Sequence, residues 1–237
     1  MWDLKTVIKY CLDEKFQPQE IINRIYFSKD HVPLNKNITP IIQDKNGIKY
    51  YLNHCCGTIE EVYEDYRWED IQSSDIVLDI GGNIGTFSLI ASQYAKEVYC
   101  VEPLYAKEIH RNILLNEIDN IHVIEGALGN GNIMNIKYGN REKSVKTLTM
   151  PELIEMCGGN VDFLKSDCEG GEIYIDSKDL HGIRRLEMEL HFFNKEYRKR
   201  INNLITELET FFESEIVDKP KWNYAIYHGI NKTDPSN

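Results

Sequence analysis

Four charged side chains crowd into one short stretch of the chain, "LKSDCEGGE", which directly follows an apolar run. They are Lys165, Asp167, Glu169 and Glu172. A carboxylate placed at the end of a buried strand can act as a general base that removes the proton of a substrate hydroxyl. A capped helix start, with Glu172 favouring the helix dipole, is the plainer interpretation. We predict Lys165, Asp167 and Glu169 as catalytic residues.

A second polar pair closes another apolar run, "EMELHFF", where Glu189 and His191 stand. Histidine has the better unperturbed pKa for base catalysis near neutral pH, whereas Asp167 has the better position in its motif. We therefore predict Asp167 as the first choice of general base and His191 as the second, with a structural role for His191 left open. Carboxylates and histidine together could bind Mg²⁺, but no ligand set is evident and we predict no metal.

A glycine-rich turn, "IVLDIGGNIGTF", is the other candidate site. The dinucleotide-binding fingerprint would need glycine where Asn83 and Thr86 stand, so that match fails. Glycine in the turn still allows a ligand to approach the backbone closely. The acid before it, Asp79, opposes a pyrophosphate and suits a cationic ligand such as the sulfonium of S-adenosylmethionine. The predicted cofactor contacts in this turn are Asp79, Gly81, Gly82, Asn83 and Gly85.

Two further segments fit the same ligand. Glu102, with Pro103 beside it, follows a second apolar run roughly 20 residues after Asp79, the spacing at which an acid reaches a ribose. A carboxylate there accepts charge-assisted hydrogen bonds from both ribose hydroxyls. The loop "EGALG" offers the small residues Gly126 and Ala127 to an adenine ring, although it is equally plausible as a plain turn.

The elements around these motifs alternate regularly from residue 75 onward. Apolar strand patterns alternate with helical patterns, which indicates a parallel sheet with right-handed crossovers. After residue 130 we expect an antiparallel hairpin or strand pair with Asn-Gly punctuation. A short helix follows, which begins with Thr149, Pro151 and Glu152 and combines a capping box with proline in its first turn. Two core strands, a helix over 195–212 and two last strands follow. Residues 1–72 form a predicted N-terminal helical and mixed extension, and residues 73–237 the ligand-binding domain. The extension includes an amphipathic helix over 2–14.

These motifs together resemble the FkbM family of S-adenosylmethionine-dependent methyltransferases. The resemblance covers about residues 76–193 and rests on "VLDIGGNIGTFS", "VEP", "NILLN", "VKTLTMPELIE" and above all "VDFLKSDCEGGE". It implies a class I, Rossmann-like fold, doubly wound, with a mostly parallel seven-stranded sheet whose last strand is antiparallel. It also implies methyl transfer, usually to a hydroxyl of a sugar or secondary metabolite. Ser166, Cys168 and Gly171 depart from the family pattern, which affects the acceptor class most.

Composition limits the partners. The formal net charge is −11, so the surface repels phosphate backbones and anionic lipid, and we predict neither nucleic acid nor membrane as a partner. No apolar run of spanning length and no signal peptide is evident, and the six cysteines form no CxxC motif, which favours a reducing, cytoplasmic setting. A homo-oligomer is compatible with the sequence.

The sequence leaves three functions open. The preferred one is S-adenosylmethionine-dependent O-methylation of a small-molecule or glycan acceptor. An NAD-dependent or nucleotide-sugar oxidoreductase would need a turn ready for phosphate, against which Asp79 argues. A non-catalytic adenosyl-binding module would not need the charged stretch around Asp167.

Overall fold

The computed structural model describes residues 41–51, 58–138 and 141–234 of the 237-residue chain. The helix predicted over 2–14 lies outside these residues. Within them, no helix combines the length and the apolar character that a membrane crossing needs.

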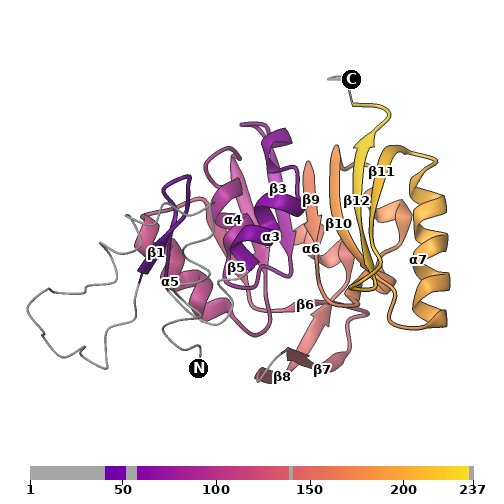
Figure 1. Ribbon diagram of the computed structural model, residues 1–237, viewed down its shortest axis with the longest axis horizontal. Helices are drawn as coiled ribbons and strands as arrows, with labels where there is room; N and C mark the ends of the chain where they lie inside the picture. The colour runs from indigo at the N-terminus through magenta and orange to yellow at the C-terminus, as the bar shows by residue number, and fades with distance from the viewer. Residues whose placement is uncertain (1–40, 52–57, 139–140, 235–237) are drawn as a thin grey trace, which may run out of the picture.

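The centre of the molecule is a seven-stranded sheet (Figure 1). Its strands, in spatial order, are β11 (Phe212–Lys219), β12 (Tyr224–Asn231), β10 (Arg185–His191), β9 (Phe163–Ser166), β3 (Ile76–Ile80), β4 (Glu97–Val101) and β5 (Ile121–Ile124). The last strand of the chain, β12, runs antiparallel to both of its neighbours, while β10, β9, β3, β4 and β5 pair in parallel. The predicted mostly parallel sheet with an antiparallel last strand is confirmed.

Helices cover both faces of this sheet. They are α3 (Thr58–Asp65), α4 (Thr86–Ala91), α5 (Ala106–Asn116), α6 (Met150–Met156) and α7 (Lys195–Leu208), with 3₁₀ helices η1 (Trp68–Asp70), η2 (Gly171–Tyr174) and η3 (Ser177–Leu180). The capping box predicted for α6 is present, because Thr149 and Glu152 exchange side-chain and backbone hydrogen bonds. The helix predicted over 195–212 ends at Leu208, because Phe212 is buried as the first residue of β11.

Two small sheets flank the central one. The first is the hairpin of β1 (Ile41–Gln43) and β2 (Lys49–Tyr51). The second joins β6 (Ala127–Leu128) and β8 (Arg141–Leu148) in parallel, with β7 (Ile133–Tyr138) paired antiparallel to β8. The antiparallel hairpin predicted after residue 130 is confirmed, and it projects below the main sheet in Figure 1.

Alternation along each strand sends side chains to two hydrophobic cores, as a pleated sheet requires. Leu78 and Ile80 enter the core that α6 and α7 cover. Val77 points into the other core, which includes Ile59 and Tyr66 from the predicted N-terminal extension. The described part of that extension therefore buries its apolar side chains in the same core as the sheet.

Strand β10 has one apolar and one charged face. Leu186, Met188 and Leu190 are buried in the first core, whereas Arg185, Glu187, Glu189 and His191 alternate with them. The segment that follows α3 lies along the charged face. The backbone N–H of Arg67 donates to Glu187 at 3.2 Å, the Arg185 guanidinium pairs with Asp70 at 2.7 Å, and Lys219 pairs with Asp65 at 2.6 Å. These contacts fix the segment that contains Tyr66 against the sheet.

Candidate active site

The glycine turn after β3 is held in a conformation that few other residues could adopt. Gly81 and Gly85 have φ values of 80° and 91°, in the left-handed region, and Asn83 has a φ of 51°. A Cβ added to Gly81 would lie 1.7 Å from the backbone oxygen of Asp167. A Cβ added to Gly82 would lie 2.2 Å from the sulfur of Cys100. The turn therefore packs its backbone directly against the end of β9.

Asp79 differs from the sequence-based prediction. Its side chain is fully buried and carries no open negative charge at the rim of a pocket. One carboxylate oxygen accepts a hydrogen bond from the Ser88 hydroxyl at 2.6 Å, and the other lies 3.2 Å from the Lys165 ammonium. A buried charge is tolerated only when it is paired, and the parallel register of β3 and β9 places Lys165 opposite Asp79. The carboxylate is therefore already engaged by Lys165 and Ser88, and its contact with a cationic ligand stays a prediction.

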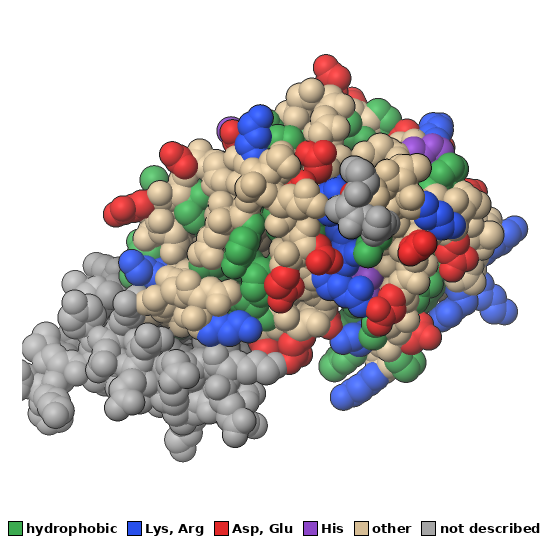
Figure 2. Space-filling view, turned by 90° about the horizontal axis from the view of Figure 1, so that it is seen from above, with side chains coloured by type: hydrophobic (Ala, Val, Ile, Leu, Met, Phe, Trp, Pro, Cys, Tyr) green, Lys and Arg blue, Asp and Glu red, His purple; other side chains and the backbone are tan. Residues whose placement is uncertain are grey.

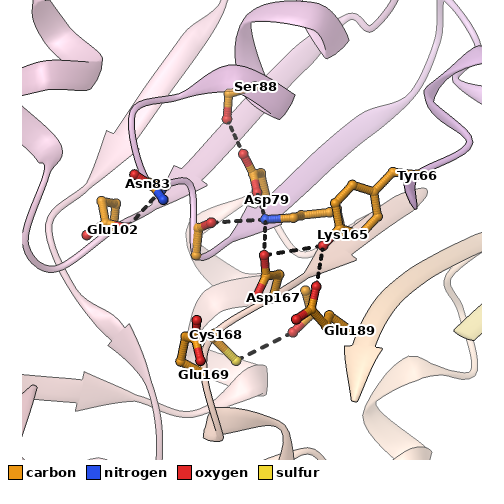
Figure 3. A network of polar contacts seen from close by, with 12 residues as sticks. Tyr66, Asp79, Asn83, Ser88, Glu102, Lys165, Asp167, Cys168, Glu169 and Glu189 are labelled. Carbon is orange, nitrogen blue, oxygen red and sulfur yellow. Dashed lines mark hydrogen bonds and ion pairs between the residues drawn. The ribbon is translucent and has the colours of Figure 1, made fainter. Parts of the chain in front are cut away.

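Lys165 connects the two halves of the site (Figure 3). Its ammonium donates to the carbonyl of Gly81 at 2.9 Å and lies 3.9 Å from the Asp167 carboxylate. Burial lowers the pKa of Lys165, but the nearby charges of Asp79 and Asp167 outweigh burial and raise it overall. Only 3% of its side chain is exposed, and its catalytic role stays a prediction.

Glu102 lies beside the glycine turn, as its spacing predicted. Its carboxylate accepts hydrogen bonds from the backbone N–H groups of Asn83 at 2.9 Å, Leu104 at 2.6 Å and Tyr105 at 3.0 Å. Burial raises the pKa of Glu102, against the effect of these hydrogen bonds. Its contact with a ribose stays a prediction. Pro103, which follows Glu102, is half-buried.

The predicted adenine loop lies at the same edge of the sheet. The backbone N–H of Glu102 donates to the carbonyl of Ile124, the last residue of β5, at 3.0 Å, and Gly126 and Ala127 lie just beyond Glu125. Gly126 is buried, with the Leu148 side chain 3.2 Å from where its Cβ would be. Their contact with an adenine ring stays a prediction.

The ends of β9 and β10 bring the predicted catalytic residues together. The Nε2 atom of His191 lies 3.1 Å from a Glu189 oxygen and 3.4 Å from a Glu169 oxygen, and its Nδ1 lies 3.2 Å from Glu172. Exposure of the carboxylate side chains falls from 51% at Glu169 through 30% at Asp167 to 14% at Glu189. Glu172 is fully buried in η2 and accepts a hydrogen bond from the backbone N–H of Cys168 at 3.2 Å. Beyond the predicted place in the first turn of a helix, it therefore also contacts Cys168 and His191.

The electrostatics of this cluster separate the two candidate bases. Burial lowers the pKa of His191, but its hydrogen bonds to Glu172 and Glu189 outweigh burial and raise it to about 11. Burial raises the pKa of Asp167, and it raises the pKa of Glu189 to about 7. Because an imidazolium cannot accept a proton, the raised pKa of His191 favours Asp167 as the predicted general base.

Asp167, Glu169 and His191 also bring one potential metal ligand each within 4.8 Å of one another. A histidine binds a metal through a neutral ring nitrogen. In the structure His191 lies within ion-pair distance of Glu172 and Glu189, and the absence of a metal stays a prediction.

Sequence reasoning missed Tyr66 and gave Glu189 only a place beside His191. The hydroxyl of Tyr66 lies 3.2 Å from an Asp167 oxygen and 3.4 Å from a Glu189 oxygen. Alternation along β10 could have assigned Glu189 to the face of His191. Tyr66 gave no comparable signal, because it lies 101 residues before Asp167 within an ordinary amphipathic pattern.

No protein-family model matches the chain, and no curated protein sequence matches it. The resemblance to the FkbM family therefore stays a prediction.

Solved structures do match in fold. The chain superposes on an rRNA methylase from Streptococcus thermophilus with a TM-score of 0.50 at 10% identity, covering 69% of this chain and 90% of that one. It superposes on Trm5b from Pyrococcus abyssi with a TM-score of 0.50 at 16% identity, covering 83% and 56%. It superposes on a putative rRNA-methylase from Clostridium thermocellum with a TM-score of 0.50 at 8% identity, covering 76% of this chain and 96% of that one. With the strand order and the antiparallel β12, these matches establish a Rossmann-like class I methyltransferase fold.

Proposed function

We propose that the chain is an S-adenosylmethionine-dependent methyltransferase that acts on a hydroxyl group of a sugar or another small metabolite. The observation that carries this proposal is the direct contact between the glycine turn and the candidate base. Gly81 packs against the backbone of Asp167 so closely that no Cβ fits between them. A donor bound at the turn would therefore lie next to the Asp167 carboxylate.

The residues of the donor side suit an adenosyl ligand. The side-chain oxygen of Asn83 is buried and has no hydrogen-bond partner within the described part of the chain, so it can accept from a ligand N–H group. Glu102 and the backbone of Gly81 and Gly82 would hold the rest of the donor. When bound, S-adenosylmethionine supplies an electrophilic methyl group on a cationic sulfur.

The acceptor side supplies the base. In the proposed reaction, the Asp167 carboxylate would take the proton of the acceptor hydroxyl while the hydroxyl oxygen bonds to the methyl carbon. The bond between that carbon and sulfur would break, and its electron pair would stay on the sulfur of the departing S-adenosylhomocysteine. Lys165 keeps Asp167 next to the turn, and the imidazolium of His191 holds Glu169 and Glu189 in place. Alignment of the two reactants contributes most of the rate, about 7–11 kcal/mol of the barrier in favourable cases, and the base adds roughly 10²–10⁴-fold.

RNA is the second candidate acceptor, because the three solved structures above are described as RNA methylases or as Trm5b. At such low sequence identity, these matches support the fold alone and not the acceptor. The acceptor side carries Asp167, Glu169 and Glu189, which would repel a phosphate backbone. On the face that Figure 2 shows, lysine and arginine side chains are interspersed with acidic ones. These charges favour an acceptor without phosphate.

The test is a screen of glycans, hydroxylated metabolites and RNA for release of S-adenosylhomocysteine. With a productive acceptor, Asp167→Asn should lower the rate of methyl transfer by roughly 10²–10⁴-fold because the base is lost. Asp176→Asn is the matched control, since Asp176 forms an exposed ion pair with Lys178. Unchanged transfer by the Asp167→Asn variant would remove Asp167 from the mechanism.

The two rival functions give different results. An NAD-dependent oxidoreductase would be stabilised thermally by NAD and not by S-adenosylhomocysteine. A non-catalytic module would bind S-adenosylhomocysteine. It would not convert S-adenosylmethionine to S-adenosylhomocysteine with any acceptor in the screen.

A further inference from the structure

Tyr66 reaches the candidate active site from outside the predicted ligand-binding domain. It directly follows α3, in the region that the sequence assigned to an N-terminal extension, and only 5% of it is exposed. Its hydroxyl lies 3.2 Å from Oδ2 of Asp167 and 3.4 Å from Oε2 of Glu189 (Figure 3). One phenol thus bridges the ends of β9 and β10.

The ring of Tyr66 is fixed by its surroundings. Phe87 of α4 packs edge-on against it, with ring centroids 5.9 Å apart and planes at 81°. The Lys165 ammonium lies 5.4 Å from the centroid of the Tyr66 ring. On either side along the chain, Asp65 pairs with Lys219 and the Arg67 backbone donates to Glu187. The hydroxyl is therefore held in place from three directions.

The phenol can donate a hydrogen bond to these carboxylates only while it stays protonated. Burial and, to a smaller extent, the negative charges of Asp167 and Glu189 raise the pKa of Tyr66 well above its ordinary value of 10.0. A hydrogen bond to a carboxylate favours its ionised form. The bond from Tyr66 accordingly lowers the pKa of Asp167, against the larger effect of burial.

We propose that Tyr66 is a positioning residue of the active site, whose hydroxyl orients the Asp167 carboxylate, supports its ionised form and links it to Glu189. The segment after α3 is then a part of the catalytic apparatus. This inference rests on the proposed function only where it treats Asp167 as the base.

Other charged or titratable groups also face Asp167, and a test has to separate them from Tyr66. They come from α3, β9, the turn after β9, η2, β10 and β12, and are Glu61, Lys165, Cys168, Glu169, Glu172, Glu189, His191 and Tyr224. Replacing Tyr66 by Phe leaves all of them in place and removes one hydroxyl.

Tyr63→Phe is the matched control. Tyr63 lies one helical turn before Tyr66 in sequence, is partly buried, and donates from its hydroxyl to Asp44 at 2.6 Å, away from the catalytic cluster. Both substitutions therefore remove a phenol–carboxylate hydrogen bond from neighbouring positions of the same segment.

The measurement is the pH titration of the Asp167 carboxyl carbon by NMR, in the full chain without ligand, with its resonance assigned through Asp167→Asn. Tyr66→Phe should raise the midpoint by about one pH unit, the scale of a hydrogen bond to a charged group. Tyr63→Phe should leave the midpoint unchanged. An unchanged midpoint in Tyr66→Phe, or equal shifts in both variants, would overturn the proposal.

A second measurement needs no substitution at Tyr66. In protein labelled at the tyrosine ring carbon that bears the hydroxyl, the Tyr66 signal should move with the midpoint of Asp167, and the Tyr63 signal should not. A Tyr66 signal that ignores the Asp167 titration would also refute the link. Neither readout requires turnover, whereas binding of S-adenosylhomocysteine tests the proposed function, so the two failures are distinguishable.

Discussion

The two halves of the candidate site handle buried charge in opposite ways. On the donor side, Asp79 is neutralised by Lys165 and Ser88, and Glu102 is engaged by three backbone N–H groups. On the acceptor side, Asp167, Glu169 and Glu189 share one imidazolium and one distant ammonium, and burial raises the pKa of each.

The difference suggests a division of labour. Under the proposed function, the backbone shape and a few acceptor atoms of the donor side would select the ligand, since the charge of Asp79 is already paired with Lys165. The acceptor side keeps an excess of carboxylates near neutral pH, which leaves proton acceptors available for chemistry. Breaking the balance on either side should therefore have different consequences.

The largest effect is expected from Lys165→Met, which leaves the fully buried Asp79 without its cation. Removal of one partner of a buried ion pair costs about 3–5 kcal/mol, and chemical denaturation should measure a loss of this size in the free energy of unfolding. Lys143→Met is the control, because its ion pair with Glu125 is exposed and should cost less than about 1 kcal/mol.

Adding Asp79→Asn to Lys165→Met should recover part of that loss, since no uncompensated charge remains. A Lys165→Met variant as stable as the Lys143→Met control would show that the donor side is not balanced by this pair.

An intermediate effect is expected from Gly81→Ala. The positive φ alone costs roughly 1–2 kcal/mol for a residue with a Cβ, and this Cβ would also displace the Asp167 backbone. Gly158→Ala is the matched control, because Gly158 has a similar φ of 85° and open space around it. Calorimetry with S-adenosylhomocysteine should find weakened binding in Gly81→Ala only, and equal binding by the two variants would contradict the close contact between turn and base.

The smallest effect concerns pH. The pKa of Glu189 rises from 4.5 to about 7 in the folded protein, so folding favours its protonated form. The associated stability is fully present below pH 4.5 and is lost as the pH rises through about 7. Thermal unfolding between pH 5 and 8 should therefore show a smaller decline for Glu189→Gln than for the unsubstituted chain, by a free energy on the order of 1 kcal/mol.

Glu213→Gln, at an exposed position of β11, should keep the full decline. Identical pH profiles for Glu189→Gln and the unsubstituted chain would mean that the acceptor side carries no such excess charge.

Local patterns predicted most of the fold. The βα alternation, the hairpin after residue 130 and the capping box of α6 depend on neighbours in sequence, and each was found. The pairing of Asp79 with Lys165 was missed because it depends on strand register across 86 residues of chain, which periodicity does not reveal. Tyr66 was missed for the same reason, since its partners lie on strands far along the chain.

Calorimetric titration of the unsubstituted chain with S-adenosylhomocysteine, beside a titration with NAD, tests the central claim most directly. The arrangement of the glycine turn, Asn83 and Glu102 predicts saturable binding of S-adenosylhomocysteine at one site and none of NAD. Binding of NAD without any heat from S-adenosylhomocysteine would contradict the assignment of this sheet edge to a methyl donor.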